Sequence, residues 1–317
     1  GYSLPAPTEP SLYAAAAVNA GMTETIADVR DPAALDVAFA AFCPETVVHL
    51  AAQSLVRASY DDPVGTYATN VMGTVHVLDA ARRTPGVRAV VVATSDKCYE
   101  NREWEWGYRE DEPMGGHDPY SSSKGCAELV TSAYRRSFFG GADAPAVASV
   151  RAGNVIGGGD WAADRLVPDA MRAFGAGAPL VVRNPAAVRP WQHVLEPLQG
   201  YLLVARRLLE GAGADQAWNF GGDHDDSRPV RYVADALAGL WGDGARWAQD
   251  PGSHPHEALS LRLDSARARL RLGWRPRLSL PRALEWVVEW YRGVAHGGDP
   301  RALTLGQIAR YQAEDPT

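Results

Sequence analysis

Short apolar runs alternate with longer segments of helical periodicity in the first half of the chain. TVVHLAA (46–52), AVVVAT (89–94) and AVASVRAG (146–153) are almost continuous in small and β-branched apolar residues, which is typical of strands buried in a parallel sheet. Segment 66–83 has helical periodicity and ends in basic residues, which suit a helix C-terminus. The alternation predicts an α/β fold with right-handed crossovers.

The pattern becomes less regular after about residue 154. WNFGG (218–222) resembles a strand, segment 230–241 a helix, and 281–294 an amphipathic helix with Trp286 and Trp290 four residues apart. Two tryptophans at that spacing are more typical of core packing than of a binding site. We therefore expect a regular first layer followed by a smaller, less regular cap.

Composition narrows the possible functions. The chain has 317 residues, of which 46% are hydrophobic and 22% charged, as in ordinary globular proteins. A net charge of −7 argues against a nucleic-acid partner bound through general basicity. Three scattered cysteines form neither a metal-ligand spacing nor a disulfide framework, so a reducing cytoplasm is the expected location. Neither a membrane-spanning run nor a signal peptide is evident, so no membrane partner is expected.

A tyrosine and a lysine four residues apart begin one helical segment. In HDPYSSSKGCAELV (117–130), Pro119 suits the first turn of a helix, and Tyr120 and Lys124 lie one turn apart on the same face. The ammonium should lower the pKa of the phenol, so that Tyr120 can take a proton from an alcohol near neutral pH. Taken alone, the spacing is weak and more typical of two unrelated surface residues.

A second polar group follows the strand at 89–94. Ser95, Asp96 and Lys97 place a hydroxyl, a carboxylate and an ammonium at its C-terminal end, where open α/β sheets bind ligands. The Tyr120 helix comes next in the chain, so both groups are expected to face one pocket. Their combination favours an active site.

Two further stretches suggest contacts with a flat cofactor. Asp28 follows a predicted strand in TIADVRD (25–31), where its carboxylate can accept a hydrogen bond from an adenine amino group. Ala51 and Ala52 end the strand in HLAAQS (49–54), where small side chains allow close approach of the backbone.

Together these stretches resemble the extended short-chain dehydrogenase/reductase family, and within it the nucleotide-sugar 4,6-dehydratases that act on CDP-glucose. The matching segments run in order from residue 1 almost to the C-terminus: GYSLPAPTEPSL, HLAAQSLVRASY, TNVMGTVHVLDA, TSDKCYENREWEWGYRE, EPMGGHDPYSSSKGCAELV, SVRAGNVIGGGDWA, RPWQHVLEPL and HPHEA. Because many segments match in the same order, a chance pairing of Tyr120 and Lys124 becomes an improbable explanation.

The resemblance implies a Rossmann-like doubly wound parallel sheet that binds NAD, formed by residues 1–153, and a smaller α/β domain for the nucleotide sugar. Residues 154–317 would form mainly this second domain, with some segments returning to the sheet. The cofactor-binding positions implied by the resemblance are Asp28, Val29, Ala51, Ala52, Asn70, Thr94, Tyr120 and Lys124.

The resemblance also implies catalytic roles in deoxysugar biosynthesis. Tyr120 would deprotonate the 4-hydroxyl of the glucosyl group while hydride leaves C4, and Lys124 would lower the Tyr120 pKa and hold the nicotinamide ribose. Ser95 would hydrogen-bond the 4-oxygen, and Asp96 would protonate the departing 6-hydroxyl. Lys97 replaces a glutamate of the related dTDP-glucose enzymes, so it is either the base at C5 or an electrostatic stabiliser.

Three positions are implied for the nucleotide sugar. Asn154 and Arg189 match positions near its diphosphate, for which the planar fork of arginine is suited. In the segment 254–257, HPHE, two histidines and one acid are too few for a metal site, so we expect a substrate loop with His256 as its contact and no metal.

Two other functions remain possible. A dehydratase or epimerase of the same fold that acts on a dTDP-, UDP- or GDP-sugar shares the Tyr120–Lys124 spacing, but an epimerase has no need of Asp96 and Lys97. The other alternative is a redox-inactive nucleotide-binding protein, which would have no need of the set formed by Ser95, Asp96, Tyr120 and Lys124.

The sequence departs from the family at its start and at one internal position. The first strand, glycine-rich turn and helix, roughly thirty or more residues, have no counterpart before Gly1. The expectation is that the sequence is a fragment of a longer chain; a natural protein without this segment is the alternative. Ser122 replaces an asparagine that is common in the family, which should be tolerated.

The resemblance finally implies a homodimer or homotetramer built on segments 66–83 and 119–138. Both carry apolar residues beyond a single stripe, as helices covered on two sides do. The positions expected at such an interface are Val71, Val75, Leu78, Leu129, Val130 and Tyr134.

Overall fold

The computed structural model describes residues 1–141, 144–252 and 257–314. Its central sheet contains four parallel strands in the order β3-β4-β5-β9. These strands span Thr46–His49, Ala89–Ala93, Ala146–Ala152 and Ala217–Phe220, respectively. The predicted strands are confirmed, except that β3 ends at His49, so Leu50 to Ala52 lie in a loop.

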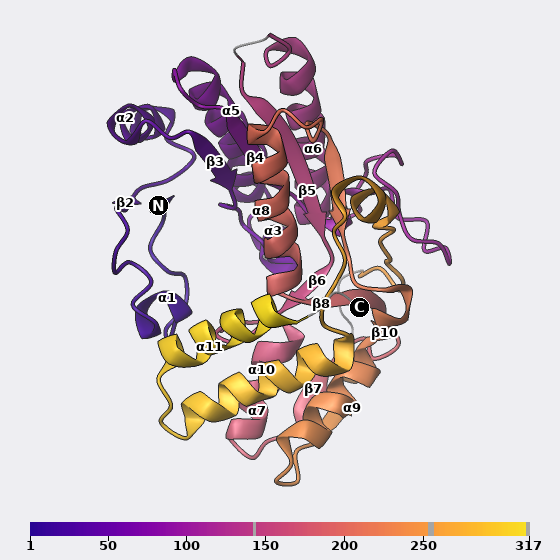
Figure 1. Cartoon of the computed structure of the whole chain (residues 1–317). Helices are drawn as coiled ribbons and strands as arrows, with labels where there is room; N and C mark the ends of the chain where they lie inside the picture. The colour runs from indigo at the N-terminus through magenta and orange to yellow at the C-terminus, as the bar shows by residue number, and fades with distance from the viewer. Residues whose placement is uncertain (142–143, 253–256, 315–317) are drawn as a thin grey trace.

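Helices cover both faces of this sheet (Figure 1). On one face, Val90 and Val92 of β4 pack in a core formed with α2 (Pro32–Phe42), α5 (Gly73–Arg83) and α6 (Pro119–Ser137). On the other face, Ala89 and Val91 pack against α8 (Leu195–Leu209) and the π-helical turn η4 (Ala268–Leu272). Since strand side chains alternate between faces, this two-sided burial explains the continuous apolar runs and confirms the α/β prediction.

The helix predicted over 66–83 is interrupted. It is preceded by α3 (Val56–Asp61) and consists of α4 (Pro63–Tyr67), the π-helical turn η1 (Ala68–Met72) and α5. Asp62 caps α4 by accepting a hydrogen bond from Gly65 N at 2.8 Å. With Pro63 in the first turn, the helix therefore begins three residues earlier than predicted.

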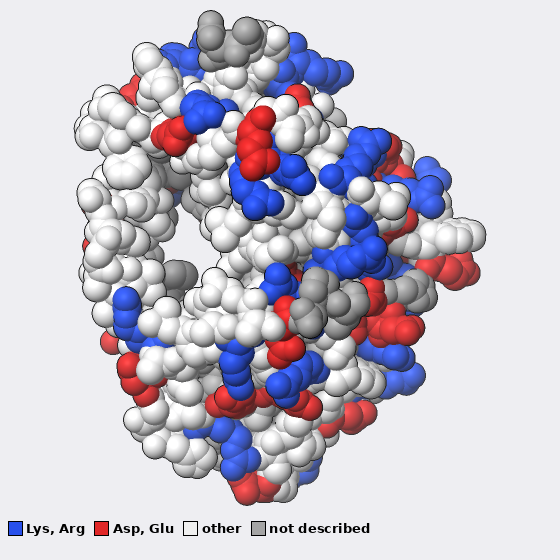
Figure 2. Space-filling view, viewed as in Figure 1, with Lys and Arg blue, Asp and Glu red and all other residues white. Residues whose placement is uncertain are grey.

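The N-terminal segment lies apart from the four-stranded sheet. Strands β1 (Tyr2–Ser3) and β2 (Thr25–Ile26) form a separate parallel pair, with α1 (Leu12–Ala15) between them. Arg301 links the segment to the C-terminal helices by donating to the Ala16 carbonyl at 2.8 Å. An opening remains between this segment and the body of the molecule (Figure 2), and charges of both signs are interspersed on the visible surface.

Most of the rest of the second half, apart from α8, β9 and η4, forms the smaller layer seen below the sheet in Figure 1. Its strands make one sheet in the order β10-β8-β6 and a parallel pair β11-β7. The remaining elements are β6 (Asn154–Ile156), α7 (Leu166–Gly175), β7 (Leu180–Val182), β8 (Val188–His193), η3 (His224–Asp226), β10 (Ser227–Pro229), α9 (Val230–Trp241), β11 (Trp247–Gln249), α10 (Leu280–Ala295) and α11 (Pro300–Ala313). Trp286 and Trp290 of α10 are buried, which confirms that they are core residues.

The outer faces of α5 and α6 differ from the expectation. Leu78 is fully buried and is therefore not available for an interface, whereas Val130 and Tyr134 pack against the same internal core but are only partly buried. Leu129 is 59% exposed, and Met72 at the end of η1 is 47% exposed. The difference arises because α5 and α6 use one broad face to cover the sheet. No helix in the described ranges is long and apolar enough to cross a membrane.

Candidate active site

The end of β4 carries a compact acidic and basic cluster. Ser95 begins the 3-10 turn η2 (Asp96–Cys98). Its hydroxyl donates to Asp96 Oδ1 at 2.9 Å, and Lys97 Nζ contacts the same oxygen at 3.3 Å. Asp96 is fully buried, and its Oδ2 atom has no hydrogen-bond partner among the described residues. A buried carboxylate oxygen without a partner is costly unless a ligand or proton satisfies it.

The first turn of α6 is held against this cluster. Asp118 caps the helix by accepting from Ser121 N at 2.9 Å. The Tyr120 amide donates to Ser59 Oγ of α3 at 3.1 Å, and Lys124 Nζ donates to the carbonyl of Ala93, the last residue of β4, at 3.3 Å. The predicted tyrosine–lysine pair therefore lies beside the predicted Ser95 turn.

Burial shifts the pKa of both residues away from the ordinary values. It raises the Tyr120 pKa to about 12, although a hydrogen bond with Ser95 acts in the opposite direction. It lowers the Lys124 pKa to about 8, against the opposing charge of Glu128. The expected lowering of the Tyr120 pKa is therefore wrong for the chain by itself, because desolvation of the phenolate outweighs its stabilisation.

A cavity of about 910 Å³ opens above these residues. Both halves of the chain contribute to its wall. The predicted site residues that line it are Thr94, Ser95, Lys97, Tyr120, Asn154 and Arg189. Asp96 and Lys124 lie buried just behind this wall and do not line it.

Two polar side chains from the second half of the chain have hydrogen-bonding groups that the described residues leave unsatisfied. Arg189 is buried, and no carboxylate of the described residues lies within ion-pair distance of it; its guanidinium donates to the Val188 carbonyl at 2.9 Å. Burial lowers its pKa, opposed by the charges of nearby carboxylates. The Asn154 Oδ1 atom is buried without a hydrogen-bond partner among the described residues. An anionic ligand with further polar groups fits both.

Most of the predicted cofactor positions do not line the cavity. The Asp28 carboxylate receives hydrogen bonds from Arg30 Nε at 2.8 Å and Nη2 at 2.6 Å, which lower its pKa. Val29 packs in the core beside the sheet, while Ala51 and Ala52 lie partly buried in the loop after β3. Their backbones, rather than their side chains, remain the groups suited to a cofactor.

Asn70 has a different arrangement from the one expected. Its amide donates to the Gln53 carbonyl and to Ser123 Oγ, both at 2.9 Å, and accepts from Gln53 N at 2.9 Å. Asn70 therefore holds the loop after β3 against α6. Thr94 likewise uses its hydroxyl to donate to Glu128.

The predicted substrate contact His256 lies outside the described residues. The following Glu257 lines the cavity and lies 3.6 Å from Arg183. Within the described ranges, no group of three or more histidine, cysteine, aspartate or glutamate side chains is placed to hold a metal ion.

Several cavity residues have no clear signal in the sequence. Arg57 and Arg183 come from opposite halves of the chain and contact Asp164 at 3.4 and 3.0 Å. Tyr201 of α8 also lines the cavity, where burial raises its pKa and the charges of Tyr120 and Asp96 raise it further. Tyr201 therefore stays protonated and faces the site as a hydroxyl; its helical pattern alone does not distinguish it from a core residue.

Known proteins share this architecture. Residues 6–221 match the NAD dependent epimerase/dehydratase family. The chain is 52% identical over 318 residues to CDP-glucose 4,6-dehydratase of Salmonella typhimurium, covering 99% of this chain and 89% of that protein.

Solved structures agree with this similarity. A dTDP-glucose 4,6-dehydratase from Streptomyces venezuelae, solved with NAD bound, aligns with a TM-score of 0.74 and 27% identity, covering 90% of this chain and 85% of that one. A UDP-glucose 4-epimerase from Thermotoga maritima aligns with a TM-score of 0.76 over 87% and 86% of the two chains, and at 21% identity it is similar in fold alone.

Proposed function

Because the chain belongs to the NAD dependent epimerase/dehydratase family, we propose that it is a CDP-glucose 4,6-dehydratase, producing CDP-4-keto-6-deoxyglucose and water. The observation that carries the proposal is the contact of Lys97 with the buried Asp96, whose second oxygen has no protein partner. An elimination of water needs a base and an acid in addition to the groups that oxidise C4, whereas epimerisation does not. The 52% identity to the Salmonella enzyme supports the same substrate.

Residues 1–153 would bind NAD, and residues 154–317 mainly the nucleotide sugar. The environment of Lys124 fits the cofactor: the ammonium is buried, has three protons to donate, and donates to the Ala93 carbonyl within the protein. A ribose diol supplies acceptors for the other protons. Asp28 would bind the adenosine end. When bound, NAD supplies the hydride acceptor for C4, the hydride donor for C6 and a positively charged ring.

Oxidation at C4 requires removal of the hydroxyl proton. Tyr120 and Ser95 both line the cavity wall, and Ser95 acts to lower the Tyr120 pKa. We assign Tyr120 as the base that takes this proton and Ser95 as the donor that holds the 4-oxygen. Lys124, one helical turn away, contributes positive charge that favours the phenolate. The high Tyr120 pKa in the chain alone implies that the base becomes effective only when further positive charge is bound.

Elimination across C5 and C6 would use Asp96 and Lys97 together. A proton that moves from Lys97 Nζ to Asp96 across their 3.3 Å contact converts an ammonium and a carboxylate into an amine and a carboxylic acid. The amine then removes the C5 proton made acidic by the 4-ketone, and the acid protonates the departing 6-hydroxyl. This step releases water and leaves an enone intermediate. The final product would form when hydride adds to C6 of this intermediate and a proton adds to C5.

The diphosphate would be bound from the second half of the chain. Arg189 and Asn154 have unused hydrogen-bonding capacity, and Arg57 and Arg183 contribute further positive charge at the cavity. His256 remains a proposed substrate contact. For the assembly we propose a homodimer or homotetramer through the exposed outer face of η1 and α6, with Met72 and Leu129 at its centre.

Incubation with CDP-, dTDP-, UDP- and GDP-glucose in deuterated water tests the function. The expected product arises from CDP-glucose, has lost one water by mass spectrometry, and carries one deuterium at C5, with no net consumption of NAD. An epimerised sugar without loss of water, or equal turnover of dTDP-glucose, would contradict the proposal.

A further inference from the structure

A buried ion pair lies directly behind the proposed active site. Glu128 of α6 and Arg151 of β5 have side chains that are 4% and 3% exposed. Arg151 Nε donates to Glu128 Oε1 at 2.8 Å, and Arg151 Nη2 donates to Oε2 at 2.7 Å. Neither residue lines the cavity, so the pair does not contact substrate directly.

The glutamate end of the pair holds the beginning of the Ser95 turn. Glu128 accepts a hydrogen bond from Thr94 Oγ1, immediately before Ser95, and another from Ser149 Oγ of β5 at 2.7 Å. Burial opposes the charge of Glu128, but Arg151 and these donors keep its pKa below the usual range. Glu128 also lies one helical turn after Lys124 and two after Tyr120, so all three share one face of α6.

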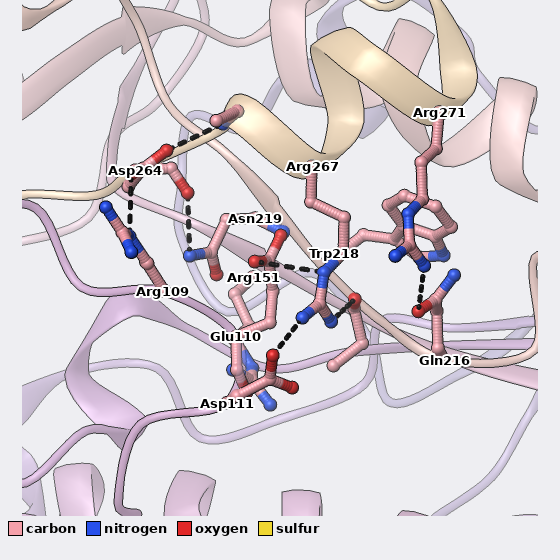
Figure 3. Close-up of polar contacts among 12 residues, drawn as sticks. Arg109, Glu110, Asp111, Arg151, Gln216, Trp218, Asn219, Asp264, Arg267 and Arg271 are labelled. Carbon is pink, nitrogen blue, oxygen red and sulfur yellow. Dashed lines mark hydrogen bonds and ion pairs between the residues drawn. The ribbon is translucent and has the colours of Figure 1, made fainter.

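The arginine end holds the other end of the turn. Arg151 Nη1 donates to the Tyr99 hydroxyl at 2.7 Å and to the Glu110 carbonyl at 3.0 Å. The Tyr99 hydroxyl in turn donates to Asn219 Oδ1 of β9 at 2.7 Å. Figure 3 shows Arg151 in the same region as Glu110 and Asn219.

We propose that the Glu128–Arg151 pair is a positioning device that fixes both ends of the Ser95–Lys97 turn relative to the helix that carries Tyr120 and Lys124. The inference rests on the proposed function and extends it to residues outside the cavity. Replacing a buried ion pair by apolar residues of similar volume is often neutral for stability. Position, rather than stability, is therefore the contribution that the pair makes.

The pair also acts on the charge of Lys124. Titratable groups that interact with this ammonium include Glu128 on α6, Cys98 on η2 and His49 on β3. Glu128 and Cys98 oppose the fall in the Lys124 pKa that burial causes. Without Glu128, Lys124 should lose its proton at a lower pH. The alkaline limb of the activity profile should then move to lower pH.

The test compares the double variant Glu128→Leu/Arg151→Met with wild type. We expect the double variant to melt within a few degrees of wild type and to have a similar KM. Its kcat falls on the order of 100-fold, as expected for a small misplacement of catalytic groups, and its alkaline limb moves to lower pH. A matched control is Glu289→Leu/Arg310→Met, which removes an exposed pair on α10 and α11 and should leave kcat unchanged.

Two single variants keep the proposal testable if the double variant fails to fold. Tyr99→Phe and Ser149→Ala each remove one hydroxyl bonded to the pair, but only Tyr99 adjoins the turn, as the residue that caps η2 at its C-terminal end. We expect kcat to fall about tenfold, equivalent to about 1.4 kcal/mol, in Tyr99→Phe and to stay near wild type in Ser149→Ala.

A normal kcat and a normal pH profile in the double variant would contradict the proposal. If the double variant does not fold, equal kcat values in Tyr99→Phe and Ser149→Ala would contradict it. Retention of NAD through gel filtration provides a readout that does not depend on the sugar substrate, since displacement of Lys124 should weaken it. If wild type does not dehydrate CDP-glucose, the proposed function fails. The positioning role is then judged by NAD retention, which must fall in the double variant.

Discussion

At the scale of single residues, the site combines groups whose ordinary charge states are opposed by burial. Burial lowers the Lys124 pKa to about 8 and raises the Tyr120 pKa to about 12. Such shifts typically occur where proton transfer takes place. The same burial lowers the free energy of unfolding, because a charged side chain loses its hydration when the chain folds. This loss can be measured.

Replacing Lys124 with methionine should stabilise the cofactor-free protein. Burial lowers the Lys124 pKa from 10.5 to about 8, and at about 1.4 kcal/mol per pKa unit the charged form costs about 3 kcal/mol on folding. Between pH 8 and 10.5, Lys124 has lost its proton in the folded protein but still carries it in the unfolded chain. The free energy of unfolding of wild type therefore rises with pH over this range, whereas that of Lys124→Met does not. Urea unfolding at about pH 7 and about pH 10 measures the difference. A constant difference between the two proteins would show that Lys124 is not desolvated.

Substitutions of Lys97 separate its two possible roles. Lys97→Arg keeps a positive charge but cannot act as a base, because arginine stays protonated, whereas Lys97→Met removes both properties. If Lys97 is the C5 base, both variants oxidise C4 but lose dehydration and deuterium incorporation. Tyr120→Phe is the control and should lose oxidation as well, lowering turnover by ~10²–10⁴. Substantial dehydration by Lys97→Arg alone would instead assign an electrostatic role.

At the scale of elements, β3 and α5 meet through a buried neutral histidine. His49 is buried at the end of β3, and its Nε2 atom is 3.1 Å from Thr74 Oγ1 of α5. Burial, reinforced by the charge of Lys124, lowers the His49 pKa to about 3. The contact between this strand and its covering helix is therefore sensitive to acid.

The stability of the protein should fall as pH decreases below 6.5. The unfolded chain protonates His49 near pH 6.5, and the folded chain does so only near pH 3. The free energy of unfolding then decreases by about 1.4 kcal/mol per pH unit from this residue alone. In His49→Gln this contribution should be absent between pH 6.5 and about 5, measured by denaturant titration. The exposed His296→Gln serves as a control and should follow wild type; equal slopes in all three proteins would refute the assignment.

At the scale of the whole molecule, both halves of the chain contribute side chains to one cavity. Arg189 and Asn154 from the second half line the same cavity as Ser95 and Tyr120 from the first. The outer face of η1 and α6 carries large exposed apolar side chains, including Leu129 and Met72. This face is available for a second copy without blocking the cavity, because none of its exposed residues lines it.

We therefore expect Leu129→Glu to dissociate the proposed oligomer. A buried leucine contributes about 1.5–3 kcal/mol per copy, and a carboxylate at the same interface would add a desolvation cost. Leu270→Glu is a matched control, since Leu270 on η4 is exposed on a different element. Light scattering at micromolar concentration should report an oligomer for wild type and Leu270→Glu and a monomer for Leu129→Glu. A monomeric wild type would contradict the proposed assembly.

The sequence by itself determined the features that depend on local pattern. Apolar runs at 46–52, 89–94 and 146–153 predicted three of the four strands of the central sheet, because burial on both faces leaves a continuous signature. The spacing of Tyr120 and Lys124 placed both on one helix face, and the order of strand and helix placed Ser95 beside them.

Tertiary structure alone decided the burial of each polar group and its partner. Nothing local indicates that Glu128 pairs with Arg151, that Asn70 holds a loop rather than facing the cavity, or that Leu78 lies in the chain's own core. It also reversed the expected direction of the Tyr120 pKa, since desolvation depends on every atom packed around the phenol. Periodicity tells which face of an element is apolar, whereas the choice of partner and the dielectric environment arise only when distant segments pack together.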